Sequence, residues 1–507
     1  MQSLKLGSPG GKNQMSQRNW LRRIHLNTET ILIAFALTVG CFLHFYRIDQ
    51  LPMGFYIDES SIGYNAYLIS TTGTDEHGVH WPLFFEAFGE YKNPLYIYLL
   101  AGLYRLLGFS QWTTRALSAF AWVVGSLYLF LLCRRIFSSH TTRLYIALAI
   151  SFTPWLFSLS RISFELISLY PLLAIHLYGL YRGFEEDSRW WKLCSGFCIG
   201  LCVYAYTTFR LLTLLYALAI LVTYGARRFR TGQYLFTLGA TSAVIPYLIY
   251  ALLHFDNLFH VFHAMTYLND PTTSFLTKIT TFIGYYLGYF SPDFLLTSGD
   301  SNLRHHTGFG GEFLTSTVVL LIVSSWIVIK RRTGPFYKYL IVGLIFTPIA
   351  AAMTPQAEHS LRAFPMVVFG VVLSAYALQE LSLLAARGVV ACTALCSLLY
   401  VLHYFIVYPP ISADAFENYG FREIFVESLD RSPKRIILAR EGDSPYMNLL
   451  FFGTLLHTDI PLLMGSRNDL HSGDAYIFLD TNYANHRLYR FEVKPSDRIE
   501  NTVSAKH

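Results

Sequence analysis

Long apolar runs recur along the whole chain and restrict its fold more than any other feature. Runs of about 18 to 24 residues are each long enough to cross the ~30 Å hydrocarbon core of a membrane as a helix. Tyrosine and tryptophan gather at the ends of these runs, where their amphipathic rings favour the membrane–water interface. With 53% hydrophobic and only 14% charged residues, the composition excludes a string of soluble domains. It predicts an all-α polytopic membrane protein.

The distribution of basic residues sets the predicted topology. Segment 93–108 is short and carries Arg105, and counting it as a span would invert every later basic loop. It is therefore predicted as a juxtamembrane helix at the outer interface, which leaves the basic loops inside. The N-terminus is then cytoplasmic and the C-terminus extracytoplasmic, in a cell inner or plasma membrane. The eleven predicted spans are about 29–46, 114–133, 144–159, 165–181, 192–208, 211–224, 233–254, 312–329, 337–352, 363–384 and 388–407.

Three domains are predicted from these boundaries. Residues 1–28 form a cytoplasmic segment, and residues 29–407 form the transmembrane domain, with outer loops 47–113 and 255–311. Residues 408–507 have the composition of a soluble chain and are predicted as a small extracytoplasmic α/β domain. Its predicted strands are 435–439 and 475–479, and its predicted helices are 421–429 and 446–456.

Charge and cysteine content exclude two further classes of protein. The formal net charge of +6 comes mainly from short basic loops. It therefore indicates which loops lie on the inner side of the membrane, and it does not indicate a nucleic-acid-binding protein. All seven cysteines lie in or at the edge of apolar runs, which implies no disulfide framework. The lipid bilayer is the one partner that composition alone predicts.

Asp58 and Glu59 follow the first span in a loop dense in ionisable groups. A partly desolvated carboxylate at a membrane face suits a general base that removes a proton from an attacking acceptor. Adjacent carboxylates could also hold a divalent cation, and no other cofactor is indicated. The alternative is a solvated acidic pair at the N-terminus of a helix.

Lys92 precedes Asn93 and Pro94, and a proline can occupy the first turn of a helix. The lysine would then lie near the headgroup plane, where it could contact a phosphate. The alternative is a lysine that snorkels to the interface. Further candidates for the same site in this loop are Tyr64, Glu90 and Tyr91.

Three arginines break the rule that keeps basic residues inside. Arg161 and Glu165 lie one helical turn apart, so an ion pair between them is the structural alternative to a role in the site. Arg304 stands in a glycine-flanked loop, and Arg362 lies at the outer end of a span. Together with Lys92 they suit an anionic lipid-phosphate donor, whose leaving charge must be stabilised. Histidine candidates beside them are His305, His306 and His359, and a weaker metal-site alternative is Asp256 with His260 and His263.

These motifs resemble those of the C-type membrane glycosyltransferases. Phe55-Tyr56-Ile57-Asp58-Glu59 resembles the acidic motif in the first loop of that superfamily, in its protein O-mannosyltransferase and aminoarabinose transferase branch. Glu90-Tyr91-Lys92-Asn93-Pro94-Leu95-Tyr96 is similar to the juxtamembrane motif of this branch, with Asn93 in place of a proline. Arg115 to Ala119, leading to Arg134-Arg135, resembles its second span, and Ser160-Arg161 to Glu165 resembles its second outer loop. The likeness covers roughly residues 30–370.

The resemblance implies inverting transfer of a sugar from a polyprenyl-phosphate donor on the extracytoplasmic face. Asp58 would be the base, Glu59 its neighbour in the site, and Lys92 a phosphate contact. Arg161, Arg304 and Arg362 are added on charge and topology. The acceptor, whether protein, lipid or glycan, and the identity of the sugar are left open.

Two other functions compete with the transferase. A transporter or flippase for a lipid-linked sugar predicts ionisable residues in the middle of spans, which are nearly absent. A non-catalytic assembly subunit predicts loss of the acidic pair, which is present.

Overall fold

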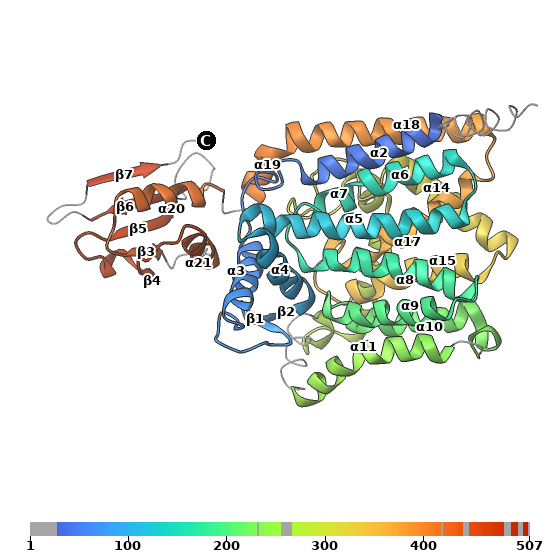
Figure 1. Cartoon of the computed structure of the whole chain (residues 1–507), viewed down its shortest axis with the longest axis horizontal. Coiled ribbons are helices and arrows are strands. Elements are labelled where there is room, and N and C mark those ends of the chain that lie inside the picture. The colour runs from blue at the N-terminus through green and yellow to red at the C-terminus, as the bar shows by residue number, and fades with distance from the viewer. Residues whose placement is uncertain are drawn as a thin grey trace, which may run out of the picture.

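The computed structural model describes residues 28–230, 233–254, 266–416, 419–439, 446–480, 488–494 and 500–504. Long helices lie side by side in one bundle, and a smaller α/β unit stands beyond one end of it (Figure 1). The helices of the bundle are α2 (Thr28–Phe45), α5 (Gln111–Ile136), α6 (His140–Phe152), α7 (Pro154–Leu159), α8 (Leu169–Phe184), α9 (Arg189–Leu201), α10 (Phe209–Arg230), α11 (Gln233–Leu253), α14 (Thr315–Arg331), α15 (Pro335–Ala351), α17 (Pro365–Leu378) and α18 (Leu383–Leu402).

Helices coincide with the apolar segments that the sequence marks as spans. Four are long and apolar enough to cross a membrane, namely Thr28–Phe45, Gln111–Ile136, Gln233–Leu253 and Leu383–Ala413. The chain is therefore a membrane protein, while the count of eleven spans stays a prediction. One predicted span, 144–159, is divided into α6 and α7, because Pro154 cannot donate the backbone hydrogen bond that a continuous helix needs.

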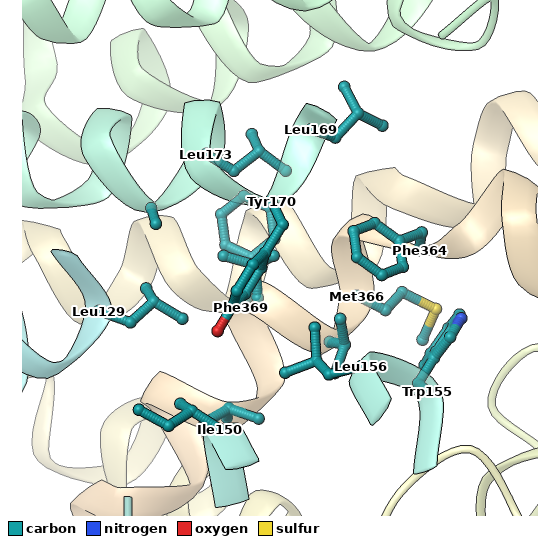
Figure 2. Packing of buried hydrophobic residues seen from close by; sticks show 14 of the residues in the cluster. Leu129, Ile150, Trp155, Leu156, Leu169, Tyr170, Leu173, Phe364, Met366 and Phe369 are labelled. Atoms are coloured by element: carbon teal, nitrogen blue, oxygen red, sulfur yellow. The ribbon is translucent and has the colours of Figure 1, made fainter. Parts of the chain in front are cut away.

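The bundle core is rich in aromatic side chains, and many of its buried polar groups are hydrogen-bonded. Trp155 lies edge-on to Phe364, with ring centroids 6.5 Å apart, and Tyr170 and Phe369 pack in the same layer (Figure 2). The Trp155 indole donates to the carbonyl of Ser360 at 3.1 Å. Buried polar groups must be satisfied internally where no water can reach them, so these contacts fix the helices relative to each other.

The first outer loop folds into short elements that cover one end of the bundle (Figure 1). Helix α3 (Ile57–Thr71) is followed by the antiparallel strands β1 (Phe85–Ala87) and β2 (Glu90–Lys92), and then by α4 (Pro94–Leu107). Pro94 occupies the first turn of α4, as the sequence predicts. The hairpin therefore places Lys92 immediately before a helix start.

Other short elements lie between the bundle helices and lead out of the last one. They are η1 (Glu165–Ser168), η2 (Cys202–Tyr204), η3 (Tyr267–Asn269), α13 (Phe275–Gly288), η4 (Asp293–Thr297), α16 (Ser360–Ala363), η5 (His403–Val407) and α19 (Tyr408–Ala415). Because η5 and α19 continue α18 without a break to Ala413, the predicted domain boundary at 407/408 falls inside a helix.

The C-terminal unit is the predicted α/β domain. Its elements are α20 (Phe421–Asp430), β3 (Ile436–Ala439), α21 (Tyr446–Leu455), β4 (Leu462–Gly465), η6 (Arg467–Asp469), β5 (Ala475–Asp480), β6 (Leu488–Val493) and β7 (Glu500–Ser504). The sheet order is β4-β3-β5-β6-β7, with β3 parallel to both β4 and β5 and the rest antiparallel. Phe451 of α21 packs against Phe55 at 4.8 Å between ring centroids, so the domain is joined to the first outer loop.

Candidate active site

A cavity of about 980 Å³ opens among the loops at the end of the bundle that α3 and the hairpin cover. Its walls come from the start of α3, from β2, from η1, from the turn before α10, and from the loops that precede α14 and α17. The sequence-predicted residues that line it are Asp58, Tyr91, Lys92, Glu165, Arg304, His305, His359 and Arg362. Segments far apart in the sequence therefore meet at one polar cavity.

Asp58 and Lys92 form an ion pair in this cavity. The Lys92 Nζ donates to Asp58 Oδ1 at 2.6 Å, and the two side chains are 13% and 33% exposed. Asp58 is in the first turn of α3, and Lys92 ends β2, so the hairpin brings the lysine to the helix N-terminus. The pair keeps the carboxylate accessible to a ligand while partly shielding it from solvent.

Glu59 lies outside the cavity, in contrast to its predicted place beside the base. Its carboxylate is fully buried and accepts hydrogen bonds at 2.8 Å from both Nε and Nη2 of Arg115. The backbone amides of Ser163 and Tyr56 donate to it as well, at 3.0 and 3.2 Å. The geometry gives Glu59 a positioning role, since it holds the start of α3 against α5.

Arg161 is also placed away from the cavity and contacts no phosphate position there. Its guanidinium is buried and donates to backbone carbonyls of the last turn of α2 and of the segment after it, including those of Leu43 and Leu51. It also donates to the Tyr404 hydroxyl at 3.2 Å. The ion pair with Glu165, the structural alternative to a role in the site, is not among the contacts of the described residues. The arginine organises the loop because buried carbonyls need donors.

Glu165 faces the cavity from η1, in the loop that precedes α8. It accepts a hydrogen bond at 2.7 Å from Asn93 Nδ2. Burial raises the pKa of Glu165 to about 7, although the nearby Lys92 charge and the bond from Asn93 act in the opposite direction. A carboxyl group with this pKa exchanges a proton near neutral pH.

Two of the predicted arginines line the cavity. The Arg304 guanidinium lies over the Tyr56 ring, 4.2 Å from its centroid, and Arg362 Nη1 donates to Thr354 Oγ1 at 2.6 Å. With Lys92 they give the cavity a positive wall, which suits an anionic ligand.

The histidine candidates separate into two groups. His305 and His359 line the cavity with ring centroids 4.7 Å apart, whereas His306 is buried against Gly299 outside it. His305 Nδ1 lies 2.9 Å from Asp300 Oδ2. Burial raises the pKa of Asp300, but the contacts with His305 and with backbone amides outweigh it and lower the value to about 2.

Among the described residues, Asp300, His305 and His359 form a group whose ligand atoms lie within 4.8 Å of one another. These residues could hold a metal ion. Asp58 and Glu59, where the sequence suggests a cation, have separate partners, since Asp58 is paired with Lys92 and Glu59 with Arg115. Asp256, His260 and His263 lie outside the described residues.

The remaining candidates from the first loop, Tyr64, Glu90 and Tyr91, differ in their position relative to the cavity. Tyr91 lines the cavity, while Tyr64 does not. The side chain of Glu90 lies outside the described part of the structure.

Sequence reasoning missed two residues, Asp300 and Arg210. Arg210, near the start of α10, lines the cavity. Arg161 was marked because an arginine on the outer side of the membrane departs from the bias that keeps basic residues inside. Arg210 lies in a predicted outer turn, so the same argument could have identified it.

Comparisons with known proteins agree with this architecture. Residues 91–250 match the family described as dolichyl-phosphate-mannose-protein mannosyltransferase. The structure is similar to that of ArnT from Cupriavidus metallidurans bound to undecaprenyl phosphate, with a TM-score of 0.61 at 12% identity over 89% of this chain and 93% of that one. The apo form of the same ArnT gives a TM-score of 0.56 at 13% identity over 89% and 87% of the two chains. No curated protein matches the sequence.

These matches confirm the resemblance to the C-type membrane glycosyltransferases and to the branch that the motifs indicate. The likeness to the two ArnT structures shows a shared fold.

Proposed function

We propose that the chain is a glycosyltransferase that moves a sugar from a polyprenyl-phosphate donor to an acceptor on the extracytoplasmic face, with inversion. The observation that carries this proposal is the Asp58–Lys92 ion pair, at 2.6 Å, inside a cavity whose wall also holds Arg304 and Arg362. A base, a cavity and several fixed cations are the parts that displacement of a lipid phosphate needs.

The proposed reaction is one direct displacement at the anomeric carbon. The acceptor oxygen or nitrogen loses its proton to Asp58 as it attacks this carbon from the face opposite the phosphate. The bond between the anomeric carbon and the phosphate oxygen breaks, and the electron pair leaves with the polyprenyl phosphate. Lys92, Arg304 and Arg362 stabilise the negative charge that develops on the leaving group.

Glu59 and Arg161 support this site without touching it. Glu59 fixes the first turn of α3 through Arg115, and Arg161 fixes the segment that leads into it. Both act as positioning residues in the proposal.

The chief alternative is a transporter of a lipid-linked sugar. Among the described residues, the buried ionisable side chains on the bundle helices are His44, Arg115, His176 and Lys192. His44, Arg115 and Lys192 lie within two turns of a helix end, while His176, in the middle of α8, contacts the Ser195 carbonyl and the Tyr339 hydroxyl through its two ring nitrogens. A transport pathway through the membrane would place such groups in mid-span. The position of these charges therefore favours the transferase.

A transfer assay on the full-length protein in lipid nanodiscs tests the proposal. It uses a panel of radiolabelled polyprenyl-phosphate sugars and candidate acceptors. We expect wild type to consume one donor, and Asp58→Asn to lower its turnover about 10²- to 10⁴-fold, the range for loss of a general base. Lys92→Ala should weaken donor binding. Asp49→Asn, in the same loop but outside the cavity, is the matched control and should keep full turnover.

Two outcomes contradict the proposal. One is equal turnover by wild type and Asp58→Asn. The other is no consumption of any donor by a protein that carries a lipid-linked sugar across the membrane of reconstituted vesicles.

A further inference from the structure

Arg210 presents buried donors to the cavity that no described residue satisfies. Its Nε and Nη2 atoms are buried and have no hydrogen-bond partner among the residues that the structure describes. The guanidinium carbon lies 5.2 Å from the Phe84 ring centroid and 5.7 Å from that of Tyr247, so aromatic rings flank the group. A buried charged group without a partner costs stability, which points to a ligand that completes it.

The two unpaired nitrogens are the pair that Arg115 uses elsewhere in this chain. Arg115 holds the two carboxylate oxygens of Glu59 with its own Nε and Nη2, both at 2.8 Å. These nitrogens lie on one edge of the planar guanidinium and bind a carboxylate through two parallel hydrogen bonds. In Arg210, which lines the cavity, the same edge is buried and unpaired among the described residues.

Neighbouring atoms in the cavity wall are unsatisfied as well. Thr208 Oγ1 and Asn93 Oδ1 are buried without a hydrogen-bond partner among the described residues, and both residues line the cavity. A hydroxyl and an amide oxygen together can donate to and accept from the hydroxyl groups of a sugar. Tyr247, which lines the cavity beside Arg210, suits the apolar face of the same ligand.

Glu165, whose charge acts on Arg210, forms no hydrogen bond with the Nε or Nη2 of that arginine. Glu165 is hydrogen-bonded to Asn93 at 2.7 Å instead. Burial raises the pKa of Glu165 to about 7, so much of its charge is lost near neutral pH. The Nε and Nη2 donors of Arg210 therefore have no hydrogen-bond partner among the described residues, and a ligand group can supply one.

We propose that Arg210 binds a carboxylate group on a substrate through its Nε and Nη2 edge, and that Thr208 and Asn93 hydrogen-bond to hydroxyl groups of the same substrate. The substrate class is an acidic sugar or an acidic acceptor. The proposal rests on the proposed function, which supplies the substrates, and adds a second anion to the donor phosphate at Lys92.

Binding of simple probes to the full-length protein in nanodiscs tests the inference. The probes are D-glucuronate, D-glucose as its uncharged counterpart, and undecaprenyl phosphate. We expect the wild-type Kd for glucuronate to be at least tenfold lower than that for glucose, a factor that corresponds to about 1.4 kcal/mol. Arg210→Gln should abolish this preference for glucuronate. Arg210→Lys should retain only part of it, since the lysine ammonium cannot form the two parallel hydrogen bonds that a guanidinium edge forms with a carboxylate.

Two controls separate binding from folding and from the donor site. Arg105→Gln removes an exposed arginine outside the cavity and should leave the preference for glucuronate intact. Lys92→Gln should weaken undecaprenyl phosphate binding and keep that preference. Melting temperatures of all variants without ligand establish that each is folded.

Two results overturn the inference. One is that the wild-type protein binds glucuronate no more tightly than glucose, and the other is that the Arg210→Gln variant still prefers glucuronate. Displacement of glucuronate by undecaprenyl phosphate, with weaker binding of that lipid in Arg210→Gln, also overturns it, because Arg210 would then hold the carrier phosphate. If glucuronate is preferred but undecaprenyl phosphate does not bind, the inference stands and the proposed function fails.

The transfer assay then assigns the source of the carboxylate. A higher KM for the donor in Arg210→Gln, with an unchanged acceptor KM, places the acid on the transferred sugar. The reverse places it on the acceptor. Unchanged values for both contradict the inference.

Discussion

The guanidinium of Arg115 holds both carboxylate oxygens of Glu59 at 2.8 Å, and neither side chain is exposed to solvent. The same guanidinium donates to the backbone carbonyls of Pro52 and Gly54, at 2.8 and 2.6 Å. One buried ion pair therefore ties the entry to α3 to the membrane helix α5. It decides which of two adjacent acids can reach the cavity.

Removing either partner of this pair should destabilise the protein. Glu59→Ala or Arg115→Ala leaves an uncompensated buried charge, which costs about 3–5 kcal/mol. We expect both variants to melt well below wild type in thermal unfolding of the nanodisc-embedded protein. Asp58→Asn is the control and should melt close to wild type, because Asp58 is partly exposed. A Glu59→Gln variant that melts like wild type but loses turnover would restore Glu59 to the catalytic role.

Arg161 is expected to act on stability rather than on donor affinity. Arg161→Gln leaves buried carbonyls near the end of α2 without their donor, at a cost of about 1–3 kcal/mol for each unsatisfied group. The melting temperature should fall, while the folded protein keeps the wild-type Kd for undecaprenyl phosphate. Arg304→Gln, in the cavity, should show the opposite pattern. A normal melting temperature with weak lipid binding in Arg161→Gln would support the original phosphate-binding prediction.

The raised pKa of Glu165 gives a stability term with a defined sign. Burial raises this pKa from 4.5 to about 7 in the folded protein. Between these two values the folded state keeps a proton that the unfolded chain has released, so stability falls as pH rises through this window. Glu165→Gln, which is neutral at every pH, should gain melting temperature relative to wild type from pH 4.5 to 7. A difference that is constant with pH contradicts this assignment.

Gly63 should be required for docking of the C-terminal domain. A Cβ at this position would lie 2.5 Å from the Phe451 ring of α21. Gly63→Leu should therefore loosen the domain, which faster limited proteolysis of residues 419–504 would reveal. The matched control is Gly102→Leu in α4, where a Cβ meets nothing within 4 Å. Equal proteolysis of the two variants would show that this contact does not hold the domain.

Local patterns were sufficient to predict much of the architecture. The run that became α2 and the run that became α5 are apolar over at least 18 residues, and a backbone inside lipid must satisfy its hydrogen bonds within a helix. The strands β3 and β5 were predicted from short apolar runs flanked by polar residues. Pro94 marked the start of α4. In each case the information lies within one segment.

The cavity was predictable only in part. Asp58 and Lys92 were identified from motifs, and the structure joins them across 34 positions of the chain. Arg210 could have been marked as an arginine in a predicted outer turn, but only the tertiary structure shows that its Nε and Nη2 donors are unpaired among the described residues.

The sequence by itself determined that this chain is helical and lies in a membrane, and it predicted that the non-anchoring charges gather in the outer loops. Hydrophobic length and charge bias act locally, so they can be read without contacts. Only the tertiary structure decided the partner of each charge. It assigned Glu59 to Arg115, 56 residues away, and Arg161 to carbonyls and a tyrosine up to 243 residues away. The physical reason is that an ion pair requires two side chains to be in contact. The packing of the whole bundle determines which segments of the chain are brought into contact.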